Sequence, residues 1–362
     1  MRSIRISIAY ITTFLIFIGI VMIYSTSGIY AMQELGDQLY YLKRHLLFLT
    51  VGLGLTVAVM TMDYRDLAKI AKPLLLFTIL LLILVLVPGI GKASYGARRW
   101  FRLGAFYFQP TELMKMAMLI YVADYLTRKQ HRIAYFADGF LPVMMVMGFV
   151  CALILKQPDL GSSFLIGMIT LIMIFIAGAR LRYIGVLSVL ALPAFYFLVY
   201  RVPYRWARIV TFLDPWGDSH GAGFQLTQSQ IALGSGGFFG VGLGKSVQKL
   251  FYLPAAHTDF ILSIIGEELG FVGAFLVIFL FMAFIWQGAR IAKRTLDPFG
   301  YFLSIGIVAM IGLQATVNVG VSIGALPTKG LPLPFISYGG SALLFNMAAV
   351  GLLLNISRIQ DL

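Results

Sequence analysis

Three ionisable side chains lie inside or at the edge of long apolar stretches of the sequence: Glu112, Lys115 and Asp259. A charge in such surroundings is unfavourable unless it is paired or hydrated, so each side chain is a candidate functional group. A carboxylate placed there can exchange a proton with a substrate, and a lysine can stabilise a phosphate. The three residues therefore indicate proton transfer and anion binding in apolar surroundings.

Glu112 and Lys115 stand three residues apart, a spacing that puts both on one face of a helix and close enough to pair. Two interpretations remain open. The pair could be a neutralised structural pair at a helix end. It could instead form the wall of a polar cavity, in which Lys115 faces a phosphate and Glu112 holds the lysine in place.

Asp259 opens an apolar stretch, and on a helix it would share a face with Ser263, Gly266 and Gly270. Small residues beside a carboxylate leave room for a ligand or for a closely packed helix. One interpretation makes Asp259 the N-cap of that helix. Another makes it the general base of a catalytic site. A single residue can serve in both roles.

Helices that cross a membrane must position these residues. Hydrophobic residues make up 60% of the chain and charged residues 12%, against roughly 45–50% and 25% in soluble domains. Backbone groups in lipid must be hydrogen-bonded within the protein, so the predicted fold is all-α. It is a polytopic membrane helix bundle that forms a single integral membrane domain over residues 1–362. We expect about ten spans of roughly 20 residues, at 8–29, 45–62, 73–89, 110–127, 138–156, 161–178, 183–200, 259–287, 300–320 and 341–357.

The distribution of basic residues predicts the orientation. Arginines and lysines are dense before the first span and in alternate loops, for example at residues 65–72, 128–132 and 290–294, as expected of cytoplasmic segments. Both termini are then cytoplasmic. The longest loop, about 201–258, is extracytoplasmic and lies between the seventh and eighth predicted spans. Its aromatic content argues against disorder, and we expect it to belong to the active-site region.

The extracytoplasmic side carries basic residues where the topology rule expects few. They are Lys92, Arg98, Arg99, Arg102, Arg201, Arg205, Arg208, Lys245 and Lys249. An anionic substrate at that surface would account for them, and contact with lipid phosphates is the alternative. The net charge of +13 follows from these loops, so we predict membrane lipid and no nucleic acid as a partner.

Two other kinds of site are not supported by the sequence. The stretch from Gly240 to Ser246 ends like a nucleotide-binding loop, GxxxxGK[ST], but Phe239 replaces its first glycine and no buried strand precedes it. ATP binding is therefore excluded. The histidines lack zinc-site spacing, and the single Cys151 excludes an internal disulfide and a cysteine-based metal cluster.

The stretch from Leu331 to Gly340 contains two prolines and two glycines and cannot form a regular helix. In a membrane protein, such backbone persists where protein or a water-filled cavity surrounds it. Ser337 and Tyr338 in this stretch are candidates for substrate binding. Helix breaking alone is the alternative interpretation.

Several of these stretches together resemble the SEDS family (shape, elongation, division and sporulation). They are residues 96–101 (GARRWF), 108–112 (FQPTE), 157–161 (QPDLG), 234–237 (GSGG), 257–259 (HTD), 266–270 (GEELG) and 331–340. The resemblance extends in order over nearly the whole chain. Within the family the chain is most similar to the division branch, through residues 212–216 (FLDPW), 240–244 (GVGLG), 248–249 (QK) and 314–320 (QATVNVG), most of which the sporulation branch shares.

The resemblance implies a peptidoglycan glycosyltransferase that polymerises lipid II, an undecaprenyl-diphosphate disaccharide-pentapeptide, at the outer face of the bacterial cytoplasmic (inner) membrane in septal synthesis. Asp259 matches an essential aspartate of the family, and Glu112 and Lys115 match an intramembrane acid–base pair. The implied partners are a class B penicillin-binding protein that cross-links the glycan and other membrane proteins of the divisome. A divalent cation, Mg²⁺ or Mn²⁺, is an expectation from the resemblance alone.

The residues fit this chemistry. Asp259 is the predicted catalytic base that takes the proton from the acceptor sugar's 4-hydroxyl, and fixed cations stabilise the departing diphosphate. We expect single displacement with inversion at the anomeric carbon. The predicted substrate-binding residues are Glu112, Lys115, Arg98, Arg99, Arg205, Lys245, His257, Thr258, Ser263, Ser337 and Tyr338.

Other functions would use some of the same features. A lipid II flippase would need charges that continue through the bilayer, whereas here they concentrate at the outer edge. A scaffolding subunit would leave Asp259, Glu112 and Lys115 without a role. The elongation and sporulation branches of the family share the same chemistry and remain alternatives to the division branch.

Overall fold

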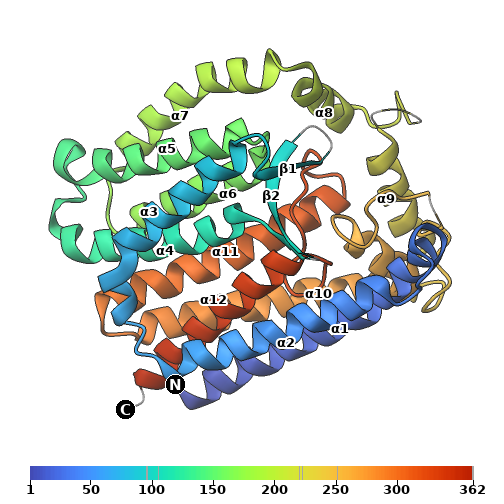
Figure 1. Cartoon of the computed structure of the whole chain (residues 1–362), viewed down its shortest axis with the longest axis horizontal. Coiled ribbons are helices and arrows are strands. Elements are labelled where there is room, and N and C mark those ends of the chain that lie inside the picture. Colours follow the sequence, from blue (N-terminus) through green and yellow to red (C-terminus); the bar gives the residue numbers. More distant parts are fainter. Residues whose placement is uncertain (95–96, 105, 220, 222, 251, 361–362) are drawn as a thin grey trace.

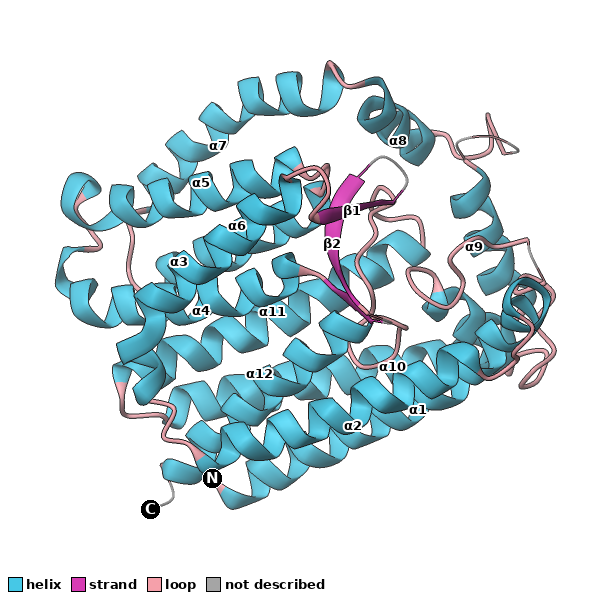
Figure 2. Cartoon of the chain, in the orientation of Figure 1, coloured by secondary structure: helices cyan, strands magenta, loops and turns pink. Residues whose placement is uncertain are grey.

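The computed structural model describes residues 1–94, 97–104, 106–219, 221, 223–250 and 252–360, and it is a helix bundle (Figure 1). The helices of the bundle are α1 (Arg2–Leu35), α2 (Tyr40–Thr61), α3 (Asp66–Leu86), α4 (Pro110–Lys129), α5 (Leu141–Lys156), α6 (Leu160–Ile176), α7 (Leu181–Phe195), α8 (Pro203–Leu213), α9 (Phe224–Ser235), α10 (Ile261–Arg294), α11 (Pro298–Ser322) and α12 (Gly340–Ile359). Short π-helical turns, Phe136–Phe140 and Tyr196–Tyr200, precede α5 and follow α7, and a 3₁₀ turn, Gln130–Arg132, follows α4. Figure 2 shows one small sheet among the helices.

Every predicted span coincides with a helix, which confirms the all-α bundle. In the part of the chain that the structure describes, seven helical segments are long and apolar enough to cross a membrane: α1, α2, α3, Phe136–Lys156, α10, α11 and α12. α6 and α7 are shorter, and α4 carries Glu112, Lys115 and Asp124 among its buried residues, which lowers its hydropathy. The number of spans therefore remains a prediction.

The bundle has a buried core and an exterior that exposes many apolar side chains. α11 and α12 are buried along most of their length, since 72% and 78% of their apolar windows lie inside the bundle. α2 and α7 instead expose large apolar side chains, among them Leu53 and Val57 of α2 and Leu190 and Leu192 of α7. Apolar side chains exposed in this number fit contact with acyl chains, because no water-soluble surface would keep them.

The sheet was not predicted from the sequence. Its strands, β1 (Gly91–Ser94), β2 (Ala97–Leu103) and β3 (Phe106–Phe108), are antiparallel in the order β1-β2-β3. They are too short to show clear alternation of apolar and polar residues, so the segment looked like a loop rich in basic residues. The sheet leads directly into α4, where Pro110 occupies the first turn as proline commonly does.

Within the segment 201–258, where we expected a long loop, the structure describes two helices, α8 and α9. The prediction for its end was wrong. α10 begins at Ile261 with Phe260 at the N-cap position, and Asp259 lies in the preceding turn. The interpretation of Asp259 as the helix N-cap is therefore incorrect, and its side chain is free for another role.

α10 is broken at Gly270, whose φ of 69° and ψ of −166° are not helical. A segment that we call the glycine strap, residues 236–243, supplies the hydrogen bonds that the break removes. The N–H groups of Val241 and Gly242 donate to the carbonyls of Glu267 and Glu268, at 2.9 and 3.0 Å. In return, the N–H groups of Phe271 and Val272 donate to the carbonyls of Gly237 and Phe238, at 2.9 and 3.2 Å. The glycine strap is thus hydrogen-bonded to α10 on both sides of the break.

Candidate active site

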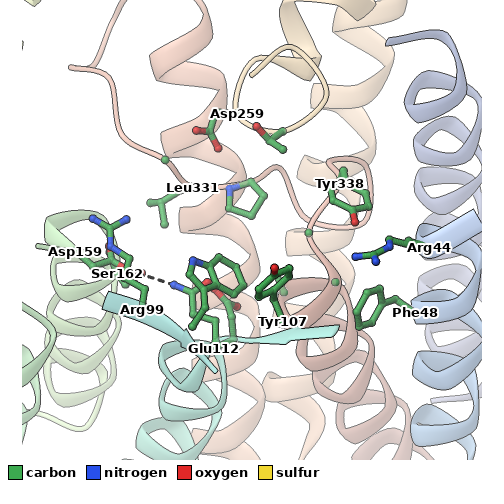
Figure 3. Close-up of a pocket in the computed structure, with 18 of the residues that line it drawn as sticks. Arg44, Phe48, Arg99, Tyr107, Glu112, Asp159, Ser162, Asp259, Leu331 and Tyr338 are labelled. Atoms are coloured by element: carbon green, nitrogen blue, oxygen red, sulfur yellow. Dashed lines mark hydrogen bonds between the residues drawn. The ribbon is translucent and has the colours of Figure 1, made fainter. Parts of the chain in front are cut away.

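Two cavities meet at Asp259. The first has a volume of about 550 Å³ and the second about 790 Å³, and both are lined by Arg99, Asp159, Asp259 and Gly330. The first cavity is surrounded by α2, the sheet, the starts of α4 and α6, and the segment 330–340 (Figure 3). The second is surrounded by α6, the turn after α7, α8 and residues 327–330. Asp259 therefore lies where ligands in the two cavities would touch.

Burial sets the ionisation of Asp259. Desolvation raises the pKa of its carboxyl to about 6, and the positive charges of Arg208 and Arg99 partly oppose that rise. No donor among the described residues hydrogen-bonds the carboxylate oxygens. A Cβ added at Gly330 would lie 3.2 Å from Oδ2, so a glycine there lets the main chain approach the carboxylate. The side chain is ionised at neutral pH and able to accept a proton.

Glu112 and Lys115 form the predicted ion pair. Lys115 Nζ lies 2.7 Å from Glu112 Oε2, and the two side chains are 2% and 5% exposed. Glu112 lines the first cavity, whereas Lys115 lines neither. Lys115 therefore neutralises the cavity carboxylate from behind, and its direct contact with a phosphate stays a prediction.

The predicted arginines separate into two groups. Arg99 lines both cavities, with Nε donating to the carbonyl of Gln157 at 2.9 Å and Nη2 to that of Pro158. Arg205 lines the second cavity and donates from Nη1 to the carbonyl of Leu198 at 2.7 Å. Arg98 is directed to the end of α3 instead, where Nη1 lies 3.5 Å from the carbonyl of Leu86. Lys245 is exposed and lines neither cavity.

Four cations of the cavities were not among the predicted site residues. They are Arg44 and Lys92 in the first cavity and Arg208 and Lys329 in the second. Lys92 and Arg208 were among the basic residues noted in the sequence on the predicted extracytoplasmic side. Arg44 lies just before the predicted second span, and Lys329 is a single lysine in a loop, so neither gave a signal. Burial, followed by the charge of Arg208, lowers the pKa of Lys329.

Asp159 was not predicted to be a site residue and appeared in the sequence analysis only within the stretch 157–161. Its carboxylate caps α6, with Oδ1 accepting from the Ser162 N–H at 3.0 Å and Oδ2 from the Ser162 hydroxyl at 2.9 Å. It is almost completely buried and lines both cavities. The hydrogen bonds within α6 fix its orientation and identify it as a positioned acceptor beside Arg99.

The remaining predicted residues surround Asp259. Thr258 and Tyr338 line the first cavity. His257 is packed among Tyr30, Tyr41 and Tyr338, with ring centroids 4.7 to 6.0 Å apart, and burial lowers its pKa to about 4, which leaves the ring neutral. It therefore acts as a packing residue at the side of the site.

Two predicted serines line neither cavity and form hydrogen bonds near Asp259 instead. Ser337 Oγ donates to the carbonyl of Thr258 and accepts from the Leu333 N–H at 2.9 Å. Ser263 is buried, with its hydroxyl 2.6 Å from that of Ser229 in α9. Both support the turn that carries Asp259.

Glu267 and Glu268 have separate partners, as the helical geometry of consecutive residues requires. Glu267 accepts from the Ser246 hydroxyl and, at 2.9 Å, from the Val247 N–H. Glu268 lies 2.7 Å from the Nζ of Lys249. This pair is buried, so Lys249 anchors the loop after the strap, and it lines neither cavity.

Metal binding has little support in the donor set. The part of the chain that the structure describes contains no group of three or more His, Cys, Asp or Glu side chains close enough to hold an ion. Asp259 also faces two arginines, which disfavour a cation beside it. These residues do not fit a resident Mg²⁺ or Mn²⁺, and no step below uses one.

Comparison with known proteins places this arrangement in context. The family model for FtsW, RodA and SpoVE, described as "Cell cycle protein", matches residues 5–361. The probable peptidoglycan glycosyltransferase FtsW of Geobacter sulfurreducens is 48% identical over 339 residues, which cover 94% of this chain and 91% of the relative. Stage V sporulation protein E of Bacillus subtilis is 43% identical over 348 residues, covering 96% and 95%.

Two solved structures share the fold. A chain from a structure titled "Structural coordination of polymerization and crosslinking by a peptidoglycan synthase complex" matches with a TM-score of 0.80 and 31% identity, covering 98% of this chain and 97% of that one. The rod shape determining protein RodA of Thermus thermophilus matches with a TM-score of 0.73 and 29% identity over the same shares. The helix arrangement is therefore that of these membrane proteins.

Proposed function

Because the chain belongs to the FtsW, RodA and SpoVE family of cell-wall proteins, we propose that this multi-pass membrane glycosyltransferase polymerises lipid II into glycan strands at the outer face of the bacterial cytoplasmic membrane. The observation that carries the proposal is the position of Asp259, a carboxylate at the junction of two cavities lined with cations. A polymerase needs two substrates at such a junction: a donor that loses its diphosphate and an acceptor that loses a proton.

The second cavity suits the diphosphate of the donor. Arg99, Arg205, Arg208 and Lys329 line it, so fixed positive charge surrounds the place where the leaving group becomes more negative. Apolar side chains, including Phe164 of α6, complete its wall and can contact the first part of a polyprenyl chain. The dipole of α6 adds to the field, because this helix begins at the second cavity and presents its positive end there.

α7 offers a route for the lipid. It arches away from α5 and α6 at the edge of the bundle (Figure 1), and its outward side chains, such as Leu190 and Leu192, are exposed. The turn that follows it supplies Leu198 and Val199 to the wall of the second cavity. A polyprenyl chain could therefore remain in the bilayer beside α7 while its diphosphate occupies the cavity.

The first cavity suits the acceptor sugar. Trp100 and Tyr107 of the sheet line it and offer flat faces against which a sugar ring can pack. Asp259 takes the proton of the acceptor 4-hydroxyl as that oxygen attacks the donor's anomeric carbon. The new carbon–oxygen bond forms while the bond to the diphosphate breaks, and the electron pair leaves with the diphosphate. A single displacement of this kind inverts the anomeric carbon.

A flippase is the second candidate function. The cations of the cavities come from the start of α2, the sheet, α8 and the loop before α12, all at one end of the bundle. At the opposite end of α4, Arg128 is paired with Asp124. Charges that gather at one end and are paired at the other favour surface chemistry over transport across the bilayer.

The role and partners follow from the relatives. We assign the chain to septal synthesis in division, because identity to the FtsW of Geobacter sulfurreducens, 48%, exceeds identity to stage V sporulation protein E, 43%. A neighbour of similar fold belongs to a complex that couples polymerization and crosslinking. A class B penicillin-binding protein is the corresponding transpeptidase partner, together with other divisome membrane proteins.

Orientation can be tested by labelling. In a Cys151→Ala background, an impermeant thiol reagent applied to intact cells should label Lys245→Cys and spare Leu296→Cys, because both positions are exposed and lie at opposite ends of the long α10. The reverse pattern would place Asp259 on the cytoplasmic side and overturn the proposal.

Reconstitution tests the reaction itself. The purified full chain, with and without its transpeptidase partner, is placed in vesicles that carry fluorescent lipid II, and the products are sized on gels. We expect glycan strands, at a higher yield when the partner is present. Movement of lipid II between leaflets without any polymer would instead establish the flippase.

A further inference from the structure

Asn318 of α11 holds two segments of the site together. Its Nδ2 donates to the carbonyl of Asp259 at 2.8 Å and to the carbonyl of Leu331 at 2.9 Å. The residue is 2% exposed, and its Oδ1 is buried without a protein partner among the described residues. Both N–H groups of the amide are thus used on main-chain oxygens, one from each segment.

The two segments carry different parts of the machinery. One is the turn that ends at Asp259. The other runs through Lys329, Gly330 and Leu331, which line the cavities. Gly330 also approaches the Asp259 carboxylate closely. The position of the base relative to a cation of the second cavity therefore depends on how these two segments are joined.

Other hydrogen bonds join the two segments to each other, and Arg208 of α8 donates from Nη1 to the carbonyl of Thr328 at 2.9 Å, which holds the second segment alone. Ser337 Oγ donates to the carbonyl of Thr258, and the Tyr338 N–H donates to the carbonyl of His257 at 3.0 Å. Asn318 differs because it belongs to α11, which is buried along most of its length. Its amide ties both segments to a rigid helix of the core.

We propose that Asn318 is a positioning residue that fixes the Asp259 turn and the 329–331 segment at one distance from each other. It contacts neither substrate and acts through the main chain of both segments. The inference rests on the proposed function for its effect on rate, but its structural part is independent of that function.

Asn355 provides a matched control. Its Nδ2 also donates to two carbonyls, those of Val59 at 2.8 Å and Met62 at 2.6 Å, and its Oδ1 is likewise buried without a protein partner in the described chain. It lies near the end of α12, far along that helix from the cavity residues at its start. Asn318→Leu and Asn355→Leu therefore remove the same kind of contact in two places.

The first readout is kinetic. In the reconstituted enzyme with its partner, Asn318→Leu should lower kcat per folded molecule about 10-fold or more with KM changed less than about 3-fold, because a displaced base slows the chemical step. Asn355→Leu should keep kcat per folded molecule within about 2-fold. Equal kcat values in the two variants would overturn the proposal. Asn318→Ser, which retains one donor, should fall between wild type and Asn318→Leu and replaces it if the leucine variant does not fold.

The second readout needs no activity. Hydrogen exchange measured by mass spectrometry should become faster in residues 255–260 and 327–336 of the Asn318 variant, and in neither segment of Asn355→Leu. Unchanged exchange in both segments would contradict the positioning role even in an active enzyme. If the wild-type protein did not polymerise lipid II but exchange in both segments were still faster in the Asn318 variant than in wild type, the positioning role would be supported and the proposed function alone would be contradicted.

Discussion

At the scale of single residues, Asp259 has the two properties that a general base requires. It lies at the junction of two cavities, and desolvation raises its pKa to about 6, so it is ionised at neutral pH yet basic enough to accept a proton. Arg208 and Arg99 hold that pKa below the value that burial alone would give. The same arginines line the cavity assigned to the diphosphate, so substrate binding and base strength are coupled.

This coupling predicts a pH dependence. Polymerisation should rise with pH through about 6 as Asp259 loses its proton, and this rise is the acidic limb of the pH profile. Arg208→Gln should move this limb to higher pH, because the arginine charge lowers the pKa of Asp259. Lys245→Gln, at an exposed position outside both cavities, should leave the limb in place. A limb at the same pH in wild type and Arg208→Gln would exclude Asp259 as the titrating group.

The same pKa shift has an effect on stability of known sign. The folded protein binds the Asp259 proton more tightly than the unfolded chain, whose aspartate has a pKa near 3.8. The group therefore favours the fold at low pH, and this contribution is lost as the pH rises from about 4 to about 6. The ionised form of Asp259, which would act as the base in the proposed mechanism, therefore stabilises the fold less than the protonated form.

The buried ion pair of α4 predicts a second result. Lys115→Met leaves the Glu112 charge buried without a partner and should lower the free energy of unfolding by about 3–5 kcal/mol, whereas the neutral double variant Glu112→Gln/Lys115→Met should lose less. Thermal unfolding in detergent measures both. Full activity of the double variant would make the pair purely structural and end its role as a cavity wall.

Charged residues of the site could be predicted from the sequence when they lay within or beside an apolar stretch of the chain. Asp259, Glu112 and Lys115 stood out for that reason, and their placement in or beside the cavity follows. Arg44 and Lys329 did not stand out, because a single basic residue at a helix start or in a loop is ordinary. Asn318 belonged to the quoted stretch 314–320 but was not predicted to be a site residue, because its two hydrogen-bond partners meet it only when distant segments are folded together.

At the scale of elements, the glycine strap explains the glycines that the sequence contains between α9 and Lys245. A Cβ at Gly236 would lie 1.9 Å from the carbonyl oxygen of Gly266, and one at Gly240 would lie 2.2 Å from that of Glu268. The strap can therefore fill the break in α10 only without side chains at these positions. The break at Gly270 and its pairing with the strap depend on tertiary contacts, so neither could be predicted from the sequence.

The strap predicts unequal effects of two neighbouring substitutions. Gly236→Ala should destabilise the protein by about 1–3 kcal/mol, because the added methyl collides with the backbone of α10. Gly234→Ala, at a helical position of α9 with nothing within 4 Å of the added Cβ, should be neutral or stabilise by about 0.5–1 kcal/mol. Thermal unfolding of both variants tests the contact. Equal stability would mean that the strap does not pack into the break.

At the scale of the whole molecule, the positions of the helices could be predicted from apolar runs, and every predicted span contains one. The convergence of α2, α4, α6 and α12 on the first cavity could not, because it depends on which helix faces meet. The short sheet and α8 also line the cavities, and both lie in segments that we predicted to be loops. The result is a bundle in which α2, α4, α6, α8 and α12 begin beside two cavities and Asp259 lies where those cavities join.

The central claim is that Asp259 is the base of glycan polymerisation, and Asp259→Asn tests it most directly. The amide has the shape of the carboxylic acid but cannot take a proton, and the helix does not depend on this side chain for its cap. The measurement is glycan-strand formation from labelled lipid II by the reconstituted variant, with lipid II binding and melting temperature measured on the same sample. The account predicts a folded protein that binds lipid II and polymerises it at least about 10²-fold more slowly than wild type. Near-normal polymerisation by a well-folded Asp259→Asn protein would contradict it.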